Sequence, residues 1–273
     1  MKVVILAGGK GTRLQEETSP RPKPMVEIGG RPILWHIMKH YARHGLKDFV
    51  IALGHRGEAI KRYFLDSHSL SGNMTIDYAS RTVERQQRDQ EDWRIHLHDT
   101  GEETNTGGRI GRLQSLLWDG TFMVTYGDGV ANVDLSELLE FHRSHKLLAT
   151  VTAVRPPARF GSLVFDGHRV TEFREKPQVG EGWINGGFLV FEPELFDYLL
   201  GDGCSLESHA MERLAADGQL AAFRHEGFWQ CMDTPREKNY LEKLWQQGTA
   251  PWKTWETIGS GSIDPFSSRV AAA

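Results

Sequence analysis

A glycine-rich segment near the start of the chain has the residue types that bind phosphate. It follows an apolar run over residues 1–7, which is typical of a buried strand. Its members are Leu6, Ala7, Gly8, Gly9, Lys10, Gly11, Thr12 and Arg13. Glycines let backbone N–H groups approach a phosphate closely, and the lysine, threonine and arginine side chains add donors. A steep turn between a strand and a helix could use the same glycines, but the adjacent Thr-Arg pair favours a polyphosphate site.

Two more cations follow on a stiff part of the chain. Arg21 and Lys23 alternate with Pro20, Pro22 and Pro24. Each proline fixes its own φ and keeps the preceding residue out of helical geometry. A proline-rich spacer is the alternative interpretation. Cations held rigidly near bound phosphates are suited to electrostatic stabilisation of a transition state.

These motifs resemble the signature of the sugar nucleotidyltransferases, also called nucleotide-diphosphate-sugar pyrophosphorylases. The matching segments, which extend over nearly the whole chain to Trp255, are Gly8-Gly9-x-Gly11-Thr12-Arg13-Leu14, Pro22-Lys23-Pro24, Gly127-Asp128-Gly129, Phe173-Arg174-Glu175-Lys176-Pro177, Asn185-Gly186-Gly187 and Trp229-x-x-Met232-Asp233-Thr234. Within the family, segments 24–30, 35–38 and 250–255 are most similar to those of the cytidylyltransferases that act on glucose 1-phosphate. The resemblance therefore implies CTP and glucose 1-phosphate as substrates.

The resemblance also implies a role for each matching residue. Arg13, Lys23 and Asp128 would act in catalysis, and Asp128 and Asp233 would together hold Mg²⁺, which prefers hard oxygen ligands. The nucleotide would contact Leu6, Ala7, Gly8, Gly9, Lys10, Gly11, Thr12, Arg13, Lys23, Thr104, Arg109, Gly127 and Asp128. The sugar phosphate would contact Glu175, Lys176, Asn185 and Gly187. Ordinary turn or hairpin sequence is the alternative for Asp128, Glu175, Asn185 and Gly187.

The implied reaction needs cations rather than a general base. A sugar 1-phosphate is already an anionic nucleophile, so it needs alignment and relief from repulsion by the triphosphate. The expected products are CDP-glucose and pyrophosphate, for nucleotide-sugar biosynthesis that supplies surface polysaccharide such as O-antigen lipopolysaccharide, or deoxysugars. The alternatives are a uridylyl- or thymidylyltransferase of the same family, or a non-catalytic relative that binds a sugar nucleotide.

Arg109 is the candidate for selecting the base, because the resemblance places the base near Thr104 and Arg109. Cytosine presents acceptors at O2 and N3, whereas uracil has an N–H at N3. A guanidinium only donates, so it can satisfy cytosine but would meet the uracil N–H donor to donor. The alternative is that Arg109 is a solvated residue at the start of a helix.

The order of predicted elements indicates an α/β fold. We expect strands over 1–7, 48–53, 73–78 and 121–126 and helices over 32–45, 57–65, 108–117 and 135–145. This alternation predicts a Rossmann-like, mixed, mostly parallel sheet flanked by helices. The strands expected after Ala149, over 150–155, 162–165, 169–175 and 185–191, suggest a smaller mixed β region over the active site. Further helices are expected over 193–200, 206–216 and 235–246.

Two segments interrupt this pattern. The polar stretch from Arg81 to Glu103 is expected to be an inserted loop or lid, with a solvated surface excursion as the alternative. Residues 258–273 turn to Gly, Ser and Ala and are expected to be a disordered tail or a cloning remnant. We therefore expect one nucleotidyltransferase domain over 1–257, with a nucleotide-binding part over 1–149 and a sugar-binding, closing part over 150–257.

Composition limits the partners. A net charge of -4 and a pI near 6.3 give no global attraction to nucleic acid or to anionic membranes, so neither is expected as a partner. No apolar run is long enough for a membrane span, no secretory leader is visible, and Cys204 and Cys231 are expected to be reduced thiols, which predicts a cytoplasmic protein. The family resemblance implies a homo-oligomer, for example a hexamer.

Two groups of aromatic residues invite chemical interpretations that we do not favour. His36, His40 and His44 have a spacing that could present zinc ligands on a helix, but we expect a partly exposed polar stripe. Trp252 and Trp255 are expected to pack or to contact another subunit rather than to stack on a base.

Overall fold

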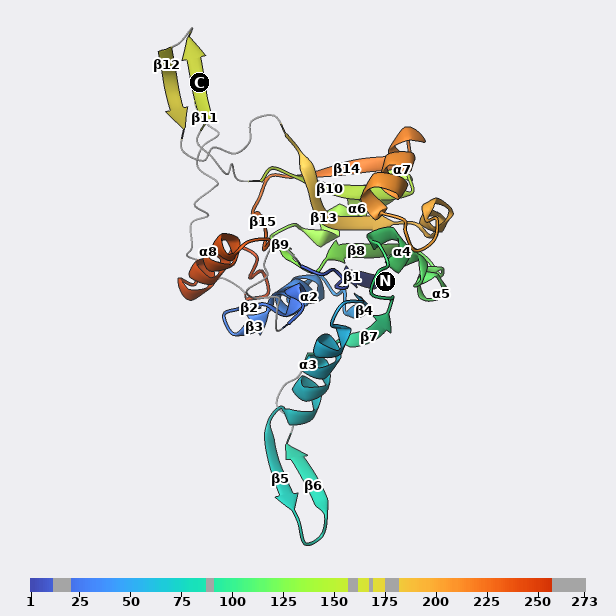
Figure 1. Cartoon of the computed structure of the whole chain (residues 1–273), viewed down its shortest axis with the longest axis vertical. Coiled ribbons are helices and arrows are strands. Elements are labelled where there is room, and N and C mark those ends of the chain that lie inside the picture. The colour runs from blue at the N-terminus through green and yellow to red at the C-terminus, as the bar shows by residue number, and fades with distance from the viewer. Residues whose placement is uncertain (12–20, 87–90, 157–161, 167–168, 175–181, 257–273) are drawn as a thin grey trace.

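A seven-stranded mixed sheet forms the centre of the protein (Figure 1). The computed structural model describes residues 1–11, 21–86, 91–156, 162–166, 169–174 and 182–256. The strand order is β14-β10-β13-β8-β1-β4-β7. In chain order the strands are β1 (Lys2–Leu6), β4 (Asp48–Leu53), β7 (Arg94–Asp99), β8 (Phe122–Tyr126), β10 (Ala149–Val154), β13 (Ile184–Phe191) and β14 (Leu220–His225).

The topology creates a binding crevice beside β1. Only β13 runs antiparallel to its neighbours in this sheet. From β1 the chain continues to β4 on one side, and it later places β8 on the other side. Ligands of open α/β sheets bind at the carboxyl ends of strands where the order reverses in this way. The sheet therefore directs the ends of β1 and β8 toward one site.

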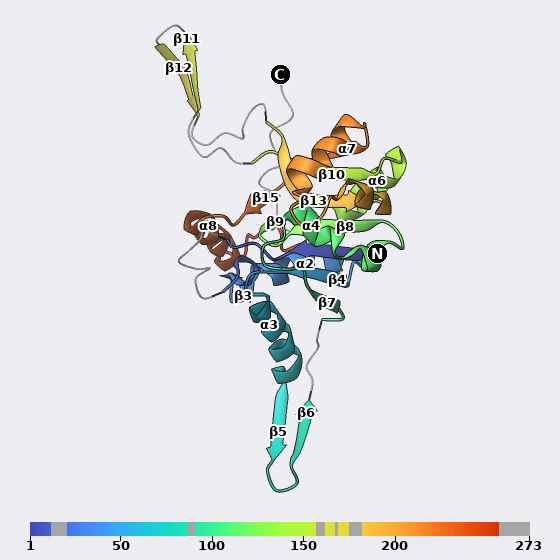
Figure 2. The same ribbon diagram turned by 45° about the vertical axis from the view of Figure 1, so that its right-hand side comes forward.

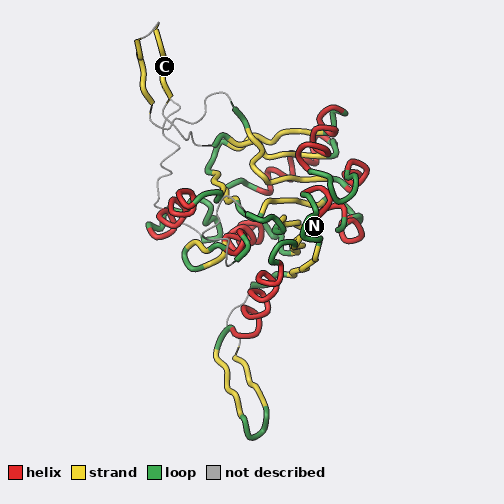
Figure 3. The backbone as a smooth tube through the Cα atoms, in the orientation of Figure 1, coloured by secondary structure: helices red, strands yellow, loops and turns green. Residues whose placement is uncertain are grey.

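Helices cover both faces of the sheet (Figure 3). The alternating side chains of β1 reach both layers. Val3 and Ile5 pack in one apolar core and Val4 and Leu6 in the other. The first core includes α2 (Ile33–Arg43), α6 (Leu135–His145) and α8 (Pro235–Gln246). The second includes α4 (Thr106–Gly111), α5 (Gln114–Leu117), the 3-10 helix η3 (Pro193–Tyr198), the π-helix η4 (Leu206–Met211) and α7 (Glu212–Ala216).

Short elements complete the edge of the crevice. They are the 3-10 helix η2 (Lys23–Met25), the pair β2 (Glu27–Ile28) and β3 (Arg31–Pro32), and the antiparallel pair β9 (Gly129–Ala131) and β15 (Trp229–Cys231). Because β9 pairs with β15, the segment after Cys231 lies beside the turn after β8.

Two hairpins project from the body in different directions (Figure 2). One arm consists of α3 (Gly57–Leu70), β5 (Asn73–Asp77) and β6 (Thr82–Gln86). The other is formed by β11 (Ser162–Asp166) and β12 (Arg169–Arg174). None of the helices in the described part of the chain has the length and apolar character needed to span a bilayer.

The predicted fold class is confirmed, but three placements are wrong. The expected lid over 81–103 contains β6 and the sheet strand β7. The β5 segment, expected in the parallel sheet, is exposed on both faces and pairs with β6 instead. Finally, β10, β13 and β14 extend the central sheet rather than forming a separate region over the site. The sequence does not predict β7 as a strand, because β7 is an edge strand that pairs only with β4 and is therefore half-exposed. Its sequence includes Arg and His instead of the continuous apolar run of a buried parallel strand.

The histidines of α2 differ from the expected exposed stripe, because His36 and His40 are buried. The Ile28 carbonyl accepts from His36 Nε2 at 2.9 Å, and His36 Nδ1 accepts from the Trp252 indole at 3.4 Å, so this imidazole is neutral. Burial lowers the pKa of His36 to about 4 and that of His40 to about 3. Within the described residues these histidines belong to no candidate metal cluster. Trp252 is buried beside them, which confirms its packing role.

Candidate active site

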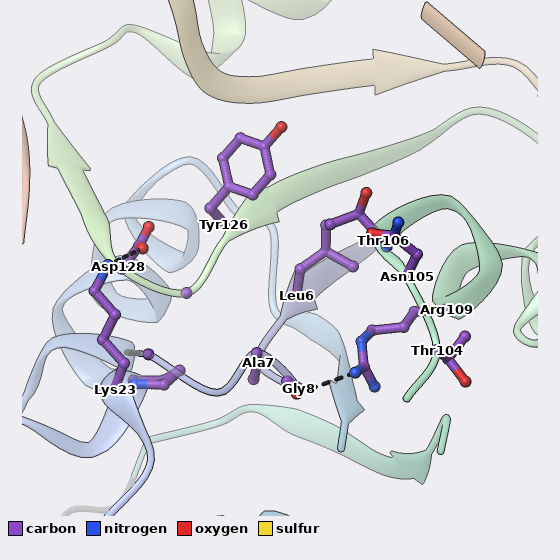
Figure 4. Close-up of a pocket in the computed structure, with 14 residues that line it drawn as sticks. Leu6, Ala7, Gly8, Lys23, Thr104, Asn105, Thr106, Arg109, Tyr126 and Asp128 are labelled. Atoms are coloured by element: carbon purple, nitrogen blue, oxygen red, sulfur yellow. Dashed lines mark hydrogen bonds and ion pairs between the residues drawn. The ribbon is translucent and has the colours of Figure 1, made fainter. Parts of the chain in front are cut away.

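A cavity of about 320 Å³ opens at the carboxyl ends of β1 and β8 (Figure 4). Most of the residues predicted to bind the nucleotide line it. These are Leu6, Ala7, Gly8, Gly9, Gly11, Lys23, Thr104, Arg109, Gly127 and Asp128. The cavity lies within the size range of small-molecule sites. Segments separated by more than a hundred residues therefore meet where the topology predicts a ligand.

Several predicted residues lie elsewhere or outside the described residues. Lys10 is exposed and forms an ion pair with Glu103 at 2.7 Å, beside the cavity rather than in its lining. The residues outside the described part of the chain are Thr12, Arg13, Glu175 and Lys176, together with residues 258–273. Their predicted roles stay predictions.

Asn185 and Gly187, predicted to contact the sugar phosphate, lie against Tyr126 and do not themselves line the cavity. The Asn185 amide donates to the Tyr126 hydroxyl at 3.1 Å and accepts from the backbone N–H of Gly187 at 2.9 Å. Gly187 has φ +79°, and a Cβ there would come within 2.5 Å of the Tyr126 ring. A glycine is therefore required for this close packing of β13 on the side chain that ends β8.

Arg109 is buried, so the solvated alternative is wrong. Its guanidinium donates to Gly101 O at 2.6 Å, Thr100 Oγ1 at 2.9 Å, Gly8 O at 3.0 Å, Leu53 O at 3.1 Å and Glu102 O at 3.2 Å. A Cβ on Gly8 or Gly54 would overlap this group. Arg109 thus holds the glycine-rich loop against the end of β4 while it lines the cavity.

Lys23 lies between the two predicted metal ligands. Its ammonium is 2.5 Å from Asp128 Oδ2 and also contacts Asp233. Burial opposes its charge, but the charges and hydrogen bonds of Asp128 and Asp233 outweigh burial and raise the pKa of Lys23 above its usual value. Two carboxylates and one cation therefore share a partly buried position at the edge of the cavity.

Long-range pairing brings these three residues together. Asp128 follows β8, and its carbonyl accepts from Met232 N at 2.8 Å, which places Asp233 beside it. Thr234 then begins α8 with a capping box completed by Glu237, and the Glu237 carboxylate also accepts from Asp233 N at 2.7 Å. The start of α8 thereby fixes the backbone of Asp233.

A second acidic group beside Asp233 is a poorer metal site. Ligand atoms of Cys231, Asp233 and Glu237 lie within 4.8 Å of one another, the only such cluster within the described residues. Glu237 is occupied by the helix cap. Burial, followed by the charges of Glu237, Asp233 and Asp128, raises the pKa of the Cys231 thiol to about 12, so it stays protonated. Both cysteines are free thiols, as predicted.

The cavity also contains side chains outside the predicted set of site residues. They are Pro24, Asn105, Thr106 and Tyr126. Tyr126 could have been inferred, because it is the last residue of a strand and directly precedes Gly127 and Asp128. Asn105 and Thr106 begin α4, and the Asn105 side chain caps that helix by accepting from Thr106 N.

Comparison with known proteins gives a consistent family. The sequence matches the family described as "Nucleotidyl transferase" over residues 2–259. It is 49% identical over 257 residues to "Glucose-1-phosphate cytidylyltransferase" of Salmonella typhi and to the protein of that name in Salmonella typhimurium, covering 94% of this chain and 100% of each relative. The fold resembles the solved inositol-1-phosphate CTP transferase from T. maritima, with a TM-score of 0.63, 14% identity and coverage of 94% of this chain and 98% of that one.

Proposed function

The chain belongs to the nucleotidyl transferase family, and from this premise we propose that it is a glucose-1-phosphate cytidylyltransferase. It would convert CTP and glucose 1-phosphate to CDP-glucose and pyrophosphate, for polysaccharide precursors. The observation that carries this proposal is the cavity that joins the glycine-rich loop to Lys23 and Asp128. The free thiols of both cysteines support a cytoplasmic location.

The residues of the cavity would align two anions rather than activate a nucleophile. An oxygen of the sugar phosphate attacks the α-phosphorus of CTP, and the bond from that phosphorus to the bridging oxygen of the β-phosphate breaks. The oxygen leaves on pyrophosphate, so no proton transfer to the chain is needed. Backbone N–H groups of the loop after β1 would hold the triphosphate, and Lys23 and Arg13 would neutralise charge that grows on the pyrophosphate.

Asp128 and Asp233 fit a divalent cation, which enzymes of this family generally use. Both carboxylates contact the same ammonium nitrogen, so their oxygens already converge on one positive charge. Carboxylate oxygens are the ligands that Mg²⁺ prefers, and two of them leave positions for phosphate. We infer that these residues hold Mg²⁺, which when bound would polarise phosphate oxygens and reduce the repulsion between substrates.

A substrate matrix tests the proposed function. CTP, UTP, dTTP, ATP and GTP are each combined with several sugar 1-phosphates in Mg²⁺ buffer, and pyrophosphate release is measured. We expect the highest kcat/KM for CTP with glucose 1-phosphate. A preference for UTP or dTTP would replace the cytidylyl assignment. If no pair released pyrophosphate, a non-catalytic sugar-nucleotide-binding protein would be the better interpretation.

Base selection can be tested at Arg109. The two terminal nitrogens of Arg109 already donate to protein oxygens, which leaves its Nε–H to face O2 or N3 of cytosine. Arg109→Ala removes that donor, and a charge-assisted hydrogen bond contributes roughly 1.5 to 3 kcal/mol. We therefore expect the ratio of kcat/KM for CTP over UTP to fall about tenfold to a hundredfold. Because the guanidinium also donates to five oxygens of the protein, kcat/KM for both nucleotides should fall as well.

The matched control is Arg112→Ala. Arg112 lies on the same segment but is exposed and paired with Asp202, so its removal should leave the CTP to UTP ratio unchanged. If Arg109→Ala lowered both kcat/KM values equally, Arg109 would only position the Gly8 loop.

The projecting arm of α3, β5 and β6 supports assembly of several copies of the chain. Its exposed large apolar side chains are Leu65, Leu70, Met74, Ile76, Tyr78 and Val83. Ile76 and Val83 are cross-strand partners, so their side chains share one face of the hairpin. An isolated two-stranded hairpin is only marginally stable in water. We infer that a second copy of this chain covers this face in a homo-oligomer such as a hexamer.

Charge introduced on that face should dissociate the oligomer. We expect Ile76→Lys combined with Val83→Glu to give a smaller species in sedimentation velocity at micromolar concentration. Leu200→Lys is the control, since Leu200 is 70% exposed outside the arm and its change should leave the mass unaltered. A wild-type chain that sediments as a monomer would rule out this assembly.

A further inference from the structure

The π-helix η4 brings a carboxylate, Glu207, to the wall of the active site. Single turns of π-helix are rare and often occur at functional sites. The segment before η4 packs tightly on α4: Gly108 N donates to Cys204 O at 3.0 Å, and a Cβ at Gly108 would come within 2.5 Å of Asp202 O. The backbone that leads into η4 is therefore fixed against the start of α4, next to the cavity.

Three hydroxyl groups from different elements donate to Glu207. Tyr126 at the end of β8 donates to Oε1 at 2.6 Å. Thr106 of α4 and Ser205, the N-cap of η4, donate to Oε2 at 2.7 Å and 2.9 Å. Tyr126 and Thr106 both line the cavity, and Figure 4 shows them reaching it from β8 and from α4. One carboxylate thus connects two walls of the site.

The direction of each hydrogen bond follows from the carboxylate, because an ionised Glu207 has no hydrogen to donate. Each hydroxyl also accepts from an N–H group. Thr106 Oγ1 accepts from Leu206 N at 2.9 Å, Ser205 Oγ from Ser208 N at 3.2 Å, and the Tyr126 hydroxyl from the Asn185 amide at 3.1 Å. Each hydroxyl hydrogen must therefore point to Glu207. A carboxylate only accepts, whereas a glutamine of the same shape would offer an acceptor on one side and a donor on the other.

Glu207 is ionised at neutral pH. Burial opposes its charge, but the hydrogen bonds from Tyr126 and Thr106 outweigh burial and hold the pKa of Glu207 below its usual value. The wall formed by Tyr126 therefore carries a negative charge behind it. Lys23, on the other side of Asp128, provides positive charge at the same cavity.

We propose that Glu207 is a positioning residue that makes Tyr126, which lines the cavity and is contacted by Asn185, part of the subsite for sugar hydroxyls. This rests on the proposed function. Because the hydrogen of the Tyr126 hydroxyl is donated to Glu207, its oxygen can only accept a hydrogen bond from a ligand. A sugar hydroxyl can donate that bond. A fully ionised phosphate has no hydrogen to donate, so its binding beside Tyr126 is disfavoured. Glu207 thereby orients the sugar phosphate, with its hydroxyl end toward Tyr126 and its anionic end directed away from this negatively charged wall.

Glu207→Gln tests this role, because it keeps the shape and reverses one hydrogen bond. If the new amide faces Tyr126, two donors point at the phenol oxygen and its hydrogen must turn toward the cavity. We expect KM for glucose 1-phosphate to rise about tenfold or more, the effect of one disrupted hydrogen bond to a charged group. KM for CTP should change by less than about threefold, and kcat should fall little, since the change affects substrate binding.

Glu192→Gln is the matched control. Glu192 is also a partly buried carboxylate that accepts from a threonine, Thr121, and from His142, but it lies outside the cavity lining. It should leave both KM values unchanged even where it lowers Tm. This control separates loss of a buried carboxylate in general from loss of the one at the active site.

A double-mutant cycle with Tyr126→Phe identifies the route of the effect. Tyr126→Phe alone should raise KM for glucose 1-phosphate, and adding Glu207→Gln should then raise it no further, because the hydroxyl that Glu207 orients is gone. The proposal is overturned if Glu207→Gln leaves KM for glucose 1-phosphate unchanged, raises both KM values equally, or adds its full effect to that of Tyr126→Phe. If the wild type uses another substrate pair, the proposed function fails, and the same cycle with that pair still tests Glu207.

Discussion

Replacing Asp128 or Asp233 by asparagine should lower kcat by about 10²- to 10³-fold, which corresponds to several kcal/mol of transition-state stabilisation. Both carboxylates already face one cation, and the proposed metal site needs their charge as well as their position. Asparagine keeps an oxygen that can accept from Lys23, so the local structure should persist. Turnover at saturating substrate, measured with Mg²⁺ varied over a wide range, should remain low at every concentration.

The control for these variants is Asp134→Asn. Asp134 caps α6 by accepting from the backbone N–H groups of Ser136 and Glu137, and it is not part of the cavity lining. Weakening this cap lowers stability by at most about 1 kcal/mol, which we expect to appear in Tm and not in kcat. The metal assignment is wrong if Asp128→Asn and Asp233→Asn both retain near wild-type turnover at ordinary Mg²⁺.

The local features of the site could be predicted from the sequence because their chemistry is contained in short segments. The loop from Leu6 to Gly11 combines a buried strand with glycines, and Lys23 follows on a proline-rich segment. The structure brings both to one cavity. Asp128 and Asp233 are separated by about a hundred residues, and only the family resemblance paired them. Their proximity depends on the β9–β15 pairing, which has no local sequence signal.

Other features depend on tertiary contacts that periodicity does not reveal. A half-exposed edge strand such as β7 has the polar composition of a loop, and β5 has the alternation of a sheet strand although it belongs to a projecting hairpin. Arginine is typical of protein surfaces, yet Arg109 is buried and donates to four carbonyl groups from three other segments of the chain, at residues 8, 53 and 101–102. No local sequence pattern indicates a role for Glu207, because its hydrogen-bond partners come from β8, α4 and the turn before η4.

Lys23→Ala should reduce kcat by about 10²- to 10³-fold, the usual effect of removing one preorganised donor from a site where negative charge develops. Lys23 lines the cavity, and its raised pKa keeps it cationic. Charge on the departing pyrophosphate grows toward the transition state, so kcat should fall more than KM for CTP rises. Lys47→Ala is the control, because Lys47 is an exposed lysine that pairs with Asp92 at 2.6 Å. It should leave both parameters unchanged.

The Mg²⁺ dependence of Lys23→Ala separates two explanations of its effect. In the structure the Lys23 ammonium occupies the position between the Asp128 and Asp233 carboxylates, so it competes with any other cation for them. Without Lys23, half-maximal activity should require the same or less Mg²⁺, although maximal kcat stays low. A higher Mg²⁺ requirement with kcat restored at saturation would mean that Lys23 only organises the two carboxylates. A rise in KM for CTP with unchanged kcat would mean that it binds the triphosphate equally in the ground and transition states.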